Sequence, residues 1–124
     1  MPVKVIDASA VSAILFAEPG SEAVARRLEH HTLVAPSLWT YEVGNVCLQK
    51  IRRHRPDRQV LLDAFSLVAR LGIEEVDVPV AQVVPLADEV GLTVYDAAYV
   101  WLARMLRVEL VTLDTALARV MART

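Results

Sequence analysis

This sequence contains little cysteine, little glycine and no long hydrophobic run. Cys47 is the only cysteine and lies among apolar residues on a helical pattern, which predicts a buried thiol without a redox role. The four glycines are widely separated, so the chain has no glycine-rich loop that could bind phosphate groups. The three histidines never stand four positions apart, which excludes a histidine metal site on one helix face.

Two further absences limit the location of the protein and its partners. No segment is apolar for long enough to span a membrane, and the start of the chain lacks the basic region of a signal peptide. We therefore expect a soluble, cytoplasmic protein that does not bind membranes. The length of 124 residues and the hydrophobic content of 55% predict a single domain over residues 1–124.

The net charge of −2 argues against a protein that is basic overall and binds nucleic acid through its whole surface. One local cluster is basic, where one predicted helix ends and the next begins: Lys50, Arg52, Arg53, His54, Arg55 and Arg58. Two interpretations of this cluster are open. It is either a solvated helix end whose cations interact favourably with the helix dipole, or a surface that contacts phosphate groups.

The hydrophobic pattern predicts an α/β fold, with a parallel sheet covered by helices on both faces. Short runs rich in β-branched residues mark four strands, at Val3 to Ile6, Thr32 to Ala35, Ile73 to Val78 and Val108 to Leu113. A fifth strand is either absent or too short to recognise in the sequence.

Helical periods fill the intervals between these strands, and proline and glycine mark many of their ends. The predicted helices run from Ser9 to Ala17, from Ser21 to just before His30, from Pro36 and Ser37 to Arg53, from Pro56 and Asp57 to Gly72, from Pro79 to Gly91, from Asp96 onward, and from Thr115 to Arg123. Pro85 is expected to kink or restart the fifth of these helices. The third and fourth form a predicted helical hairpin.

Four acidic residues interrupt apolar stretches of the chain: Asp7, Glu42, Asp96 and Asp114. Asp7 and Asp114 close predicted strands, at the edge of a parallel sheet where ligands bind. Carboxylates about 4 Å apart repel by on the order of 4 kcal/mol per pair at an effective dielectric near 20, so a converging group needs a cation or protons. Oxygen ligands without cysteine or histidine favour Mg²⁺, with Mn²⁺ as the alternative.

A simpler interpretation is open for each of these carboxylates. Asp7, Asp96 and Asp114 each precede a predicted helix, so each side chain could cap the first amides of that helix. Glu42 lies more than one turn inside its predicted helix and cannot act in this way. With Asn45 and Gln49, however, it could form a polar stripe that faces water.

Four segments together resemble the PIN-domain ribonucleases, and most closely the VapC toxins of bacterial and archaeal toxin–antitoxin pairs. They are VIDASAV (Val5 to Val11), APSLWTYEVGNV (Ala35 to Val46), GLTVYDAAYVWLA (Gly91 to Ala103) and LVTLD (Leu110 to Asp114). The resemblance covers nearly the whole chain and has an acidic residue at each expected place. It implies a three-layer α/β/α PIN-like fold and the activity of a Mg²⁺-dependent endoribonuclease.

By this resemblance the four carboxylates are the acidic quartet of the family, with Asp7 and Asp96 as the direct magnesium ligands and Ser9, Asn45 and Thr112 as supporting polar residues. The implied substrate is RNA, commonly a structured one such as tRNA. The implied partners are a cognate antitoxin and a second copy of the chain in a homodimer. Metal-activated water would attack the phosphodiester in line and leave a 5′-phosphate and a 3′-hydroxyl.

The chain departs from the family pattern in two ways. No acidic residue follows shortly after Asp114, so a second metal would be held less well, and no fifth strand is clear. The alternative function is a catalytically silent PIN-like module that binds a protein or RNA partner, although all four acidic positions are filled. A receiver domain would need a lysine near a late strand, and the only lysines of this chain are Lys4 and Lys50. A haloacid-dehalogenase-type phosphatase would need an aspartate at the position of Ser9.

Overall fold

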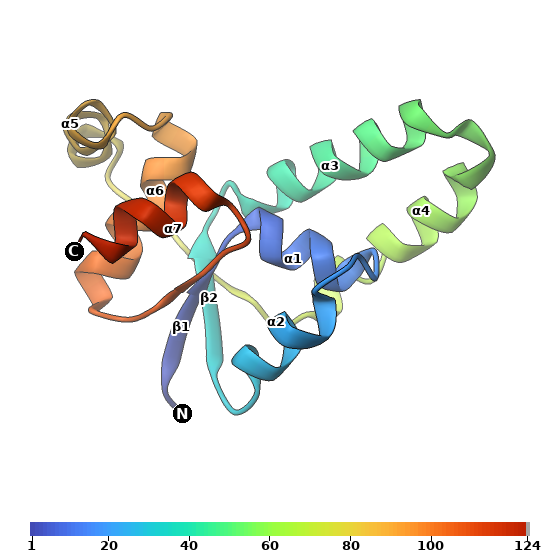
Figure 1. Cartoon of the computed structure of the whole chain (residues 1–124), viewed down its shortest axis with the longest axis horizontal. Helices are drawn as coiled ribbons and strands as arrows, with labels where there is room; N and C mark the ends of the chain where they lie inside the picture. Colours follow the sequence, from blue (N-terminus) through green and yellow to red (C-terminus); the bar gives the residue numbers. More distant parts are fainter. Residues whose placement is uncertain (124) are drawn as a thin grey trace.

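A parallel sheet of four strands lies at the centre of the computed structural model, which describes residues 1–123 (Figure 1). The strands are β1 (Val3–Ile6), β2 (Thr32–Pro36), β3 (Glu74–Val76) and β4 (Leu110–Val111). Their spatial order is β3-β2-β1-β4, and each neighbouring pair is parallel. The predicted parallel sheet is confirmed, and residues 1–123 contain no fifth strand.

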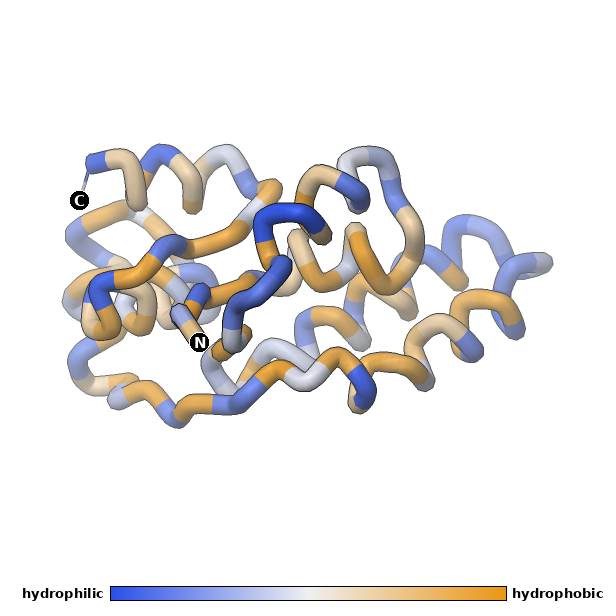
Figure 2. The backbone as a smooth tube through the Cα atoms, turned by 90° about the horizontal axis from the view of Figure 1, so that it is seen from below, coloured by the Kyte–Doolittle hydropathy of each residue, from blue (hydrophilic) through white to orange (hydrophobic). Residues whose placement is uncertain are grey.

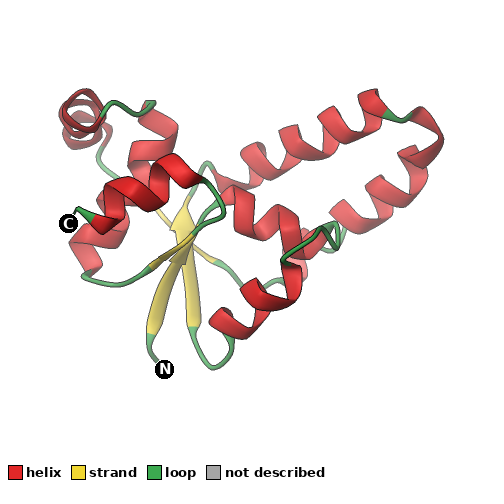
Figure 3. Cartoon of the chain, viewed as in Figure 1, coloured by secondary structure: helices red, strands yellow, loops and turns green. Residues whose placement is uncertain are grey.

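Helices cover both faces of this sheet, which confirms the three-layer α/β/α arrangement (Figures 1 and 3). The helix α6 contacts three strands, β1, β2 and β4, and packs against α5 and α7. On the other side of the sheet α1 packs against α2 and α3. The α-helices of residues 1–123 are α1 (Ala8–Leu15), α2 (Ser21–Leu28), α3 (Trp39–Arg53), α4 (Arg58–Phe65), α5 (Val80–Val90), α6 (Val94–Leu106) and α7 (Thr115–Ala122).

The central strand β1 is buried on both of its faces. Val5 and Ile6 point to opposite sides of the sheet because side chains alternate along a strand, and their exposed fractions are 0% and 1%. On α6 the buried residues include Val100, Leu102 and Ala103, which belong to the same core. This packing fixes the point at which β1 ends, and therefore the position of the residue that follows it.

The helices α3 and α4 form the predicted hairpin, which projects from the rest of the molecule (Figure 1). They turn into one another through a short 3₁₀ helix, η1 (Arg55–Asp57). A Cβ added at Gly44 of α3 would lie 3.6 Å from the ring of Phe65 on α4, so the two helices approach closely there. Cys47 is buried between them, as predicted, and its thiol donates to the carbonyl oxygen of Leu61 at 3.6 Å.

Several predicted elements are shorter in the structure. The fourth strand, predicted over Val108 to Leu113, spans only Leu110–Val111, because the backbone pairs with β1 at those two residues alone. The third strand spans only Glu74–Val76, and its two glutamates are exposed at the edge of the sheet, where strand pairing ends sooner. The fourth helix ends at Phe65 instead of reaching Gly72, and a second 3₁₀ helix, η2 (Val68–Arg70), follows it. The Ser66 hydroxyl donates to the carbonyl oxygen of Asp63 at 2.6 Å, a local bond that competes with continued helix.

Two other helix boundaries also differ from the prediction. Pro85 is predicted to kink or restart the helix α5, and the restart is wrong because α5 continues through Pro85 as one element. The helix α6 starts at Val94, two residues before the predicted start at Asp96. Gly91 ends α5 in the left-handed conformation, as its type predicts. In the part of the chain that the structure describes, no helix is both long enough and apolar enough to cross a membrane.

Candidate functional site

Asp7 lies where β1 gives way to α1, and only 3% of the residue is exposed. Its extended backbone makes it the N-cap of α1, so the capping interpretation is correct here, with Oδ1 accepting from the Ala10 amide at 3.0 Å. The Ser9 hydroxyl donates to the same oxygen at 2.7 Å, and the Thr112 hydroxyl donates to Oδ2 at 2.5 Å. Because both oxygens accept bonds from the protein, the orientation of this carboxylate is fixed.

The two hydroxyl groups also tie the loop after β4 to the loop after β1. The oxygens of Ser9 and Thr112 lie 3.3 Å apart. The Leu113 amide donates to the Ser9 oxygen at 2.9 Å, and the Asp114 amide donates to the Thr112 oxygen at 2.9 Å. The structure therefore places Ser9 and Thr112 beside Asp7 and brings the start of α7 to the same end of the sheet.

Asp114 and Asp96 both stand at helix starts but make different contacts. Asp114 is the N-cap of α7, and its Oδ1 accepts from the Ala116 and Leu117 amides at 2.8 and 3.0 Å. Asp96 does not cap its helix, because the Thr93 side chain is the cap of α6 and accepts from the Asp96 amide at 3.1 Å. The capping interpretation is therefore wrong for Asp96, whose carboxylate is not used to start the helix.

Glu42 lies in the first turn of α3 because that helix begins at Trp39, later than predicted, and its side chain is half-buried. The Tyr99 hydroxyl of α6 donates to Glu42 Oε1 at 2.5 Å. Asn45 and Gln49 on nearly the same side of α3 are exposed. The predicted polar stripe thus faces water from Asn45 onward, whereas Glu42 turns towards the interior.

Electrostatic repulsion links the four carboxylates to one another. Burial, and to a smaller extent the charge of Asp114, raises the pKa of Asp7 despite its three hydrogen bonds. Burial also raises the pKa of Glu42, with added repulsion from Asp96 and Asp7. The pKa of Asp96 is raised by burial and by the Asp114 charge. Electrostatic repulsion thus couples the four carboxylates pairwise at the carboxyl end of the sheet, where Figure 3 shows the strand arrowheads.

No lysine or arginine within residues 1–123 forms a salt bridge with any of these four carboxylates. The protein instead supplies neutral hydrogen-bond donors: hydroxyl groups and backbone amides. Such donors lower a carboxylate pKa but add no positive charge. The excess of negative charge at this end of the sheet is therefore not neutralised by the described residues.

Tyr99 is the contact that sequence reasoning missed. Burial and the hydrogen bond to Glu42 raise its pKa far above the usual range, so the hydroxyl stays protonated and acts as a donor. One signal was available, because Tyr99 stands three positions after Asp96 and so falls on the same side of one helix. Its partner is 57 residues away in sequence and could not be identified without the packing of α3 against α6.

Asn45 lies apart from the carboxylates. It makes no hydrogen bond to them within the described part of the chain and lines a groove of about 410 Å³ that Glu42 also borders. Two exposed tyrosines border the same groove, Tyr41 and Tyr95, each one position before a site carboxylate. The predicted supporting residues thus divide into two that contact Asp7 and one that faces the groove.

The donor set at this site fits a hard divalent cation by its chemistry: carboxylate oxygens with raised pKa values and no cationic partner. Within residues 1–123 no three acidic, histidine or cysteine side chains approach closely enough to form a finished set of ligands. Repulsion gives a physical reason, since each carboxylate turns to a neutral donor such as Thr112 or Tyr99. A cation would reverse the sign of that interaction and favour closer approach.

The sequence and the fold of this chain are both similar to those of known proteins. A family model described as "PIN domain" matches residues 4–122. The chain is 37% identical to Ribonuclease VapC3 of Pyrobaculum aerophilum, over 92% of this chain and 91% of that protein. It is 33% identical to Ribonuclease VapC12 of Mycobacterium tuberculosis, over 93% and 89%. The crystal structure of PAE2754 from Pyrobaculum aerophilum is similar, with a TM-score of 0.76, 28% identity and coverage of 95% of this chain and 85% of that one.

Proposed function

This chain belongs to the PIN-domain family and to its VapC ribonucleases, and we propose that it is an endoribonuclease that hydrolyses RNA phosphodiester bonds with a divalent metal ion. In this proposal residues 1–124 form one nuclease domain, which acts in the cytoplasm as the toxin of a VapBC-type pair. Its partners are a cognate antitoxin, a second copy of the chain and an RNA substrate such as tRNA.

One observation carries the proposal. Carboxylates from four separate parts of the chain, the ends of β1 and β4 and the starts of α3 and α6, repel one another at one end of the sheet. Such an arrangement destabilises the fold unless a cation is bound, because like charges close together and partly shielded from water cost free energy. Its presence therefore suggests a functional role. Four acidic groups without a cation would also repel RNA. Both difficulties are removed by Mg²⁺ or Mn²⁺.

Asp7 and Asp96 are the proposed direct ligands, with Asp114 and Glu42 beside them. Asp7 is held in orientation by Ser9 and Thr112, and Asp96 is not engaged in capping its helix. When bound, the metal supplies Lewis-acid polarisation of the phosphodiester and of a water molecule, and offsets the charge of the carboxylates. Asn45 faces the groove, where its amide is available to an RNA strand.

Glu42 is the proposed acceptor of the proton from the attacking water. Its raised pKa brings it closer to neutral pH, where a general base is most effective. Tyr99 holds Oε1 and leaves Oε2 for this role. Asp114 is less suitable, because its Oδ1 already accepts two backbone amides. The products would be a 5′-phosphate and a 3′-hydroxyl.

The test is an RNA cleavage assay with Mg²⁺, with EDTA, and with the variants Asp7→Asn and Asp96→Asn. We expect loss of cleavage in EDTA and a reduction on the order of a hundredfold to a thousandfold in each variant, because each removes charge that stabilises the reacting centre. Asp88→Asn is the matched control, because Asp88 is exposed on α5. This variant should cleave RNA as the wild type does. Equal cleavage under all conditions would remove the metal mechanism, and absence of cleavage by the wild type would favour a silent binding module.

A further inference from the structure

The tip of the α3–α4 hairpin carries four exposed arginines within seven positions: Arg52, Arg53, Arg55 and Arg58. We call these four residues the arginine tip. They occupy the end of α3, the short helix η1 and the start of α4. Figure 1 shows this turn at the far end of the hairpin, and Figure 2 shows the same end of the molecule as strongly hydrophilic.

The other two basic residues of the cluster are already paired. Lys50 binds Glu18 at 2.6 Å and lies 5.5 Å from the centre of the Phe16 ring, so it anchors α3 to the end of α1. His54 lies 3.0 Å from Asp57, the one acidic residue at the turn. Within residues 1–123, by contrast, no arginine of the tip forms a salt bridge. Their four charges are therefore available to an external anion.

Two arginines of the tip, Arg52 and Arg53, lie on the same side of α3 as Glu42 of the acidic site. With 3.6 residues per turn, positions 42, 45, 49, 52 and 53 fall on the same side of the helix. Asn45, Gln49, Arg52 and Arg53 are all exposed along this side. The distance along the helix axis from Glu42 to Arg53 is about 16 Å, at about 1.5 Å per residue. A polar, solvent-accessible track thus connects the carboxylates to the arginines.

We propose that the arginine tip binds backbone phosphates of the same RNA strand whose scissile bond lies at the carboxylates. This inference rests on the proposed function and adds a second contact point to it. At about 3.4 Å per stacked nucleotide, 16 Å corresponds to roughly five nucleotides between the bond that is cut and the phosphates that are bound. The tip is therefore a positioning surface, which selects RNA long enough to reach from one site to the other.

The position of the tip, at the end of the α3 side that leads to the carboxylates, favours RNA over an acidic protein as its partner. The chain as a whole has a net charge of −2, so attraction to a polyanion must arise locally. Guanidinium groups pair with phosphate through two parallel hydrogen bonds. The exposed amides of Asn45 and Gln49, between the tip and the site, offer further donors along the same face. A strand that runs along α3 would use all of these groups.

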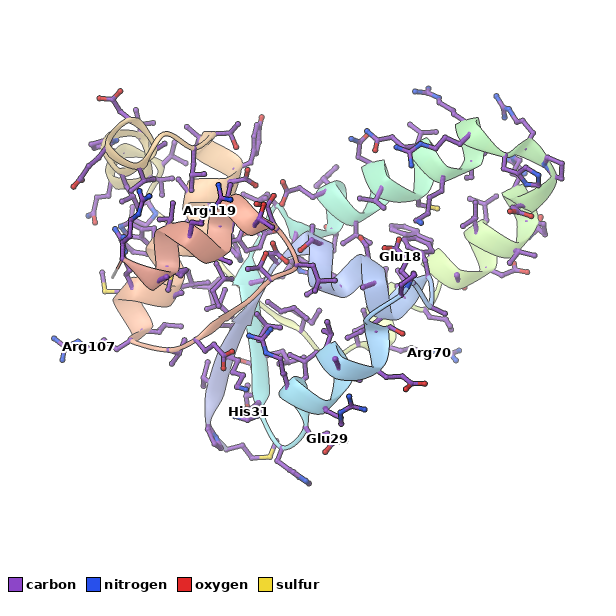
Figure 4. All side chains as sticks on the ribbon, in the orientation of Figure 1. Glu18, Glu29, His31, Arg70, Arg107 and Arg119 are labelled. Carbon is purple, nitrogen blue, oxygen red and sulfur yellow. The ribbon has the colours of Figure 1, made fainter. Side chains whose placement is uncertain are left out.

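The experiment compares two RNA substrates and two sets of variants. The tip variant changes all four arginines to Gln, and the control variant combines Arg70→Gln and Arg107→Gln, which remove exposed charges that lie away from the tip (Figure 4). The long substrate is a labelled RNA of roughly twenty nucleotides, and the short one has roughly three nucleotides, too few to span 16 Å. A further variant with Lys at all four positions keeps the charge.

For the long RNA we expect the tip variant to raise KM on the order of tenfold or more, with little change in kcat, because four phosphate contacts are lost. The salt dependence of binding should also weaken, by up to about 3 in the slope of log K against log salt. The short RNA should be cleaved by the tip variant as by the wild type. The Lys variant should recover most of the affinity, which a merely structural role would not produce.

Binding of the labelled long RNA in EDTA separates this inference from the proposed function. Tip-dependent binding without metal-dependent cleavage would remove the nuclease proposal and leave the RNA contact in place. Equal KM and equal binding in the tip and control variants would overturn the inference. A tip variant that binds RNA normally but no longer binds an acidic protein partner would overturn it as well.

Discussion

The strand β1 connects two opposite electrostatic arrangements, three residues apart in the sequence. At Lys4, the ammonium group lies 3.1 Å from Glu109, and Arg27 also binds that carboxylate, so one acid meets two cations. These contacts lower the pKa of Glu109. Around Asp7, four acids lie within electrostatic range of one another without a cation from residues 1–123, and burial and repulsion from Asp114 raise the pKa of Asp7. The first arrangement joins elements of the fold, whereas the second is suited to binding something from outside.

The two ends of β1 also differ in what their charges contribute to the stability of the fold. The Glu109 cluster is largely exposed, and ion pairs of that kind contribute at most about 1 kcal/mol to stability. At the acidic site Asp7 is buried and the other three carboxylates are partly buried, so their charges oppose folding as long as no cation is present. This contrast supports the proposal that the protein acts at the acidic end of β1.

Among substitutions outside the four carboxylates, Tyr99→Phe should have the largest effect on cleavage, because it removes the donor that orients Glu42. We expect cleavage to fall by about fivefold to tenfold, as the loss of one positioning hydrogen bond of about 1 kcal/mol implies. The bond lowers the pKa of Glu42, so its loss should move the acid limb of the rate profile to higher pH. Met105→Leu, at an exposed position of the same helix that does not border the groove, is the control. Equal behaviour of the two variants would show that Tyr99 has only a packing role.

Asp96→Asn and Glu109→Gln should change stability in opposite directions in metal-free protein. Asp96 caps no helix and repels its neighbours, so its neutralisation should raise the melting temperature by roughly 2–4 °C, for about 0.5–1 kcal/mol of repulsion left after screening by water. Glu109→Gln removes two favourable partners and should lower it slightly. Thermal unfolding in EDTA measures both, with Asp88→Asn unchanged. A lower melting temperature for Asp96→Asn would contradict the repulsion argument.

The acidic site and Glu109 should also have opposite effects on how the free energy of unfolding depends on pH, and these effects should be smaller. Asp7, Glu42 and Asp96 have raised pKa values, so the folded metal-free protein binds protons more tightly than the unfolded chain does. Its free energy of unfolding should therefore fall as the pH rises from about 4 through these raised values. Glu109 acts in the opposite sense, since its contribution is lost as the pH falls below about 4.5. Denaturant unfolding in EDTA at several pH values, with Asp96→Asn beside the wild type, tests this. A midpoint that rises steadily from pH 4 to 7 would be contrary to the expectation.

Local sequence signals were sufficient for some parts of the fold and of the site. The strand Val3–Ile6 was predicted with its correct bounds because a short apolar run met an aspartate and a helix start. Gly91 predicted the end of α5 because only glycine adopts a left-handed cap easily. For Asp7 and Asp114, capping and membership of the acidic group were weighed as alternatives, yet both side chains cap a helix and also lie among the four carboxylates.

Tertiary contacts decided the remaining parts. The start of α6 was misplaced because Asp96 and Thr93 are both good caps, and only the structure determines which one is used. The third strand is short because its place at the sheet edge gives it one neighbour. The bond between Tyr99 and Glu42 joins two helices that no sequence period relates. The basic cluster likewise had two interpretations until the structure separated the paired Lys50 from the arginines.

A calorimetric titration of metal-free protein with Mn²⁺ tests most directly whether the four carboxylates form one cation site. We predict that the wild type and Asp88→Asn bind Mn²⁺ and that this binding weakens as the pH is lowered, because ligands with raised pKa values must lose protons to bind. Asp96→Asn should bind on the order of tenfold or more weakly. Equal binding by the wild type and Asp96→Asn, or no binding by either, would contradict this account.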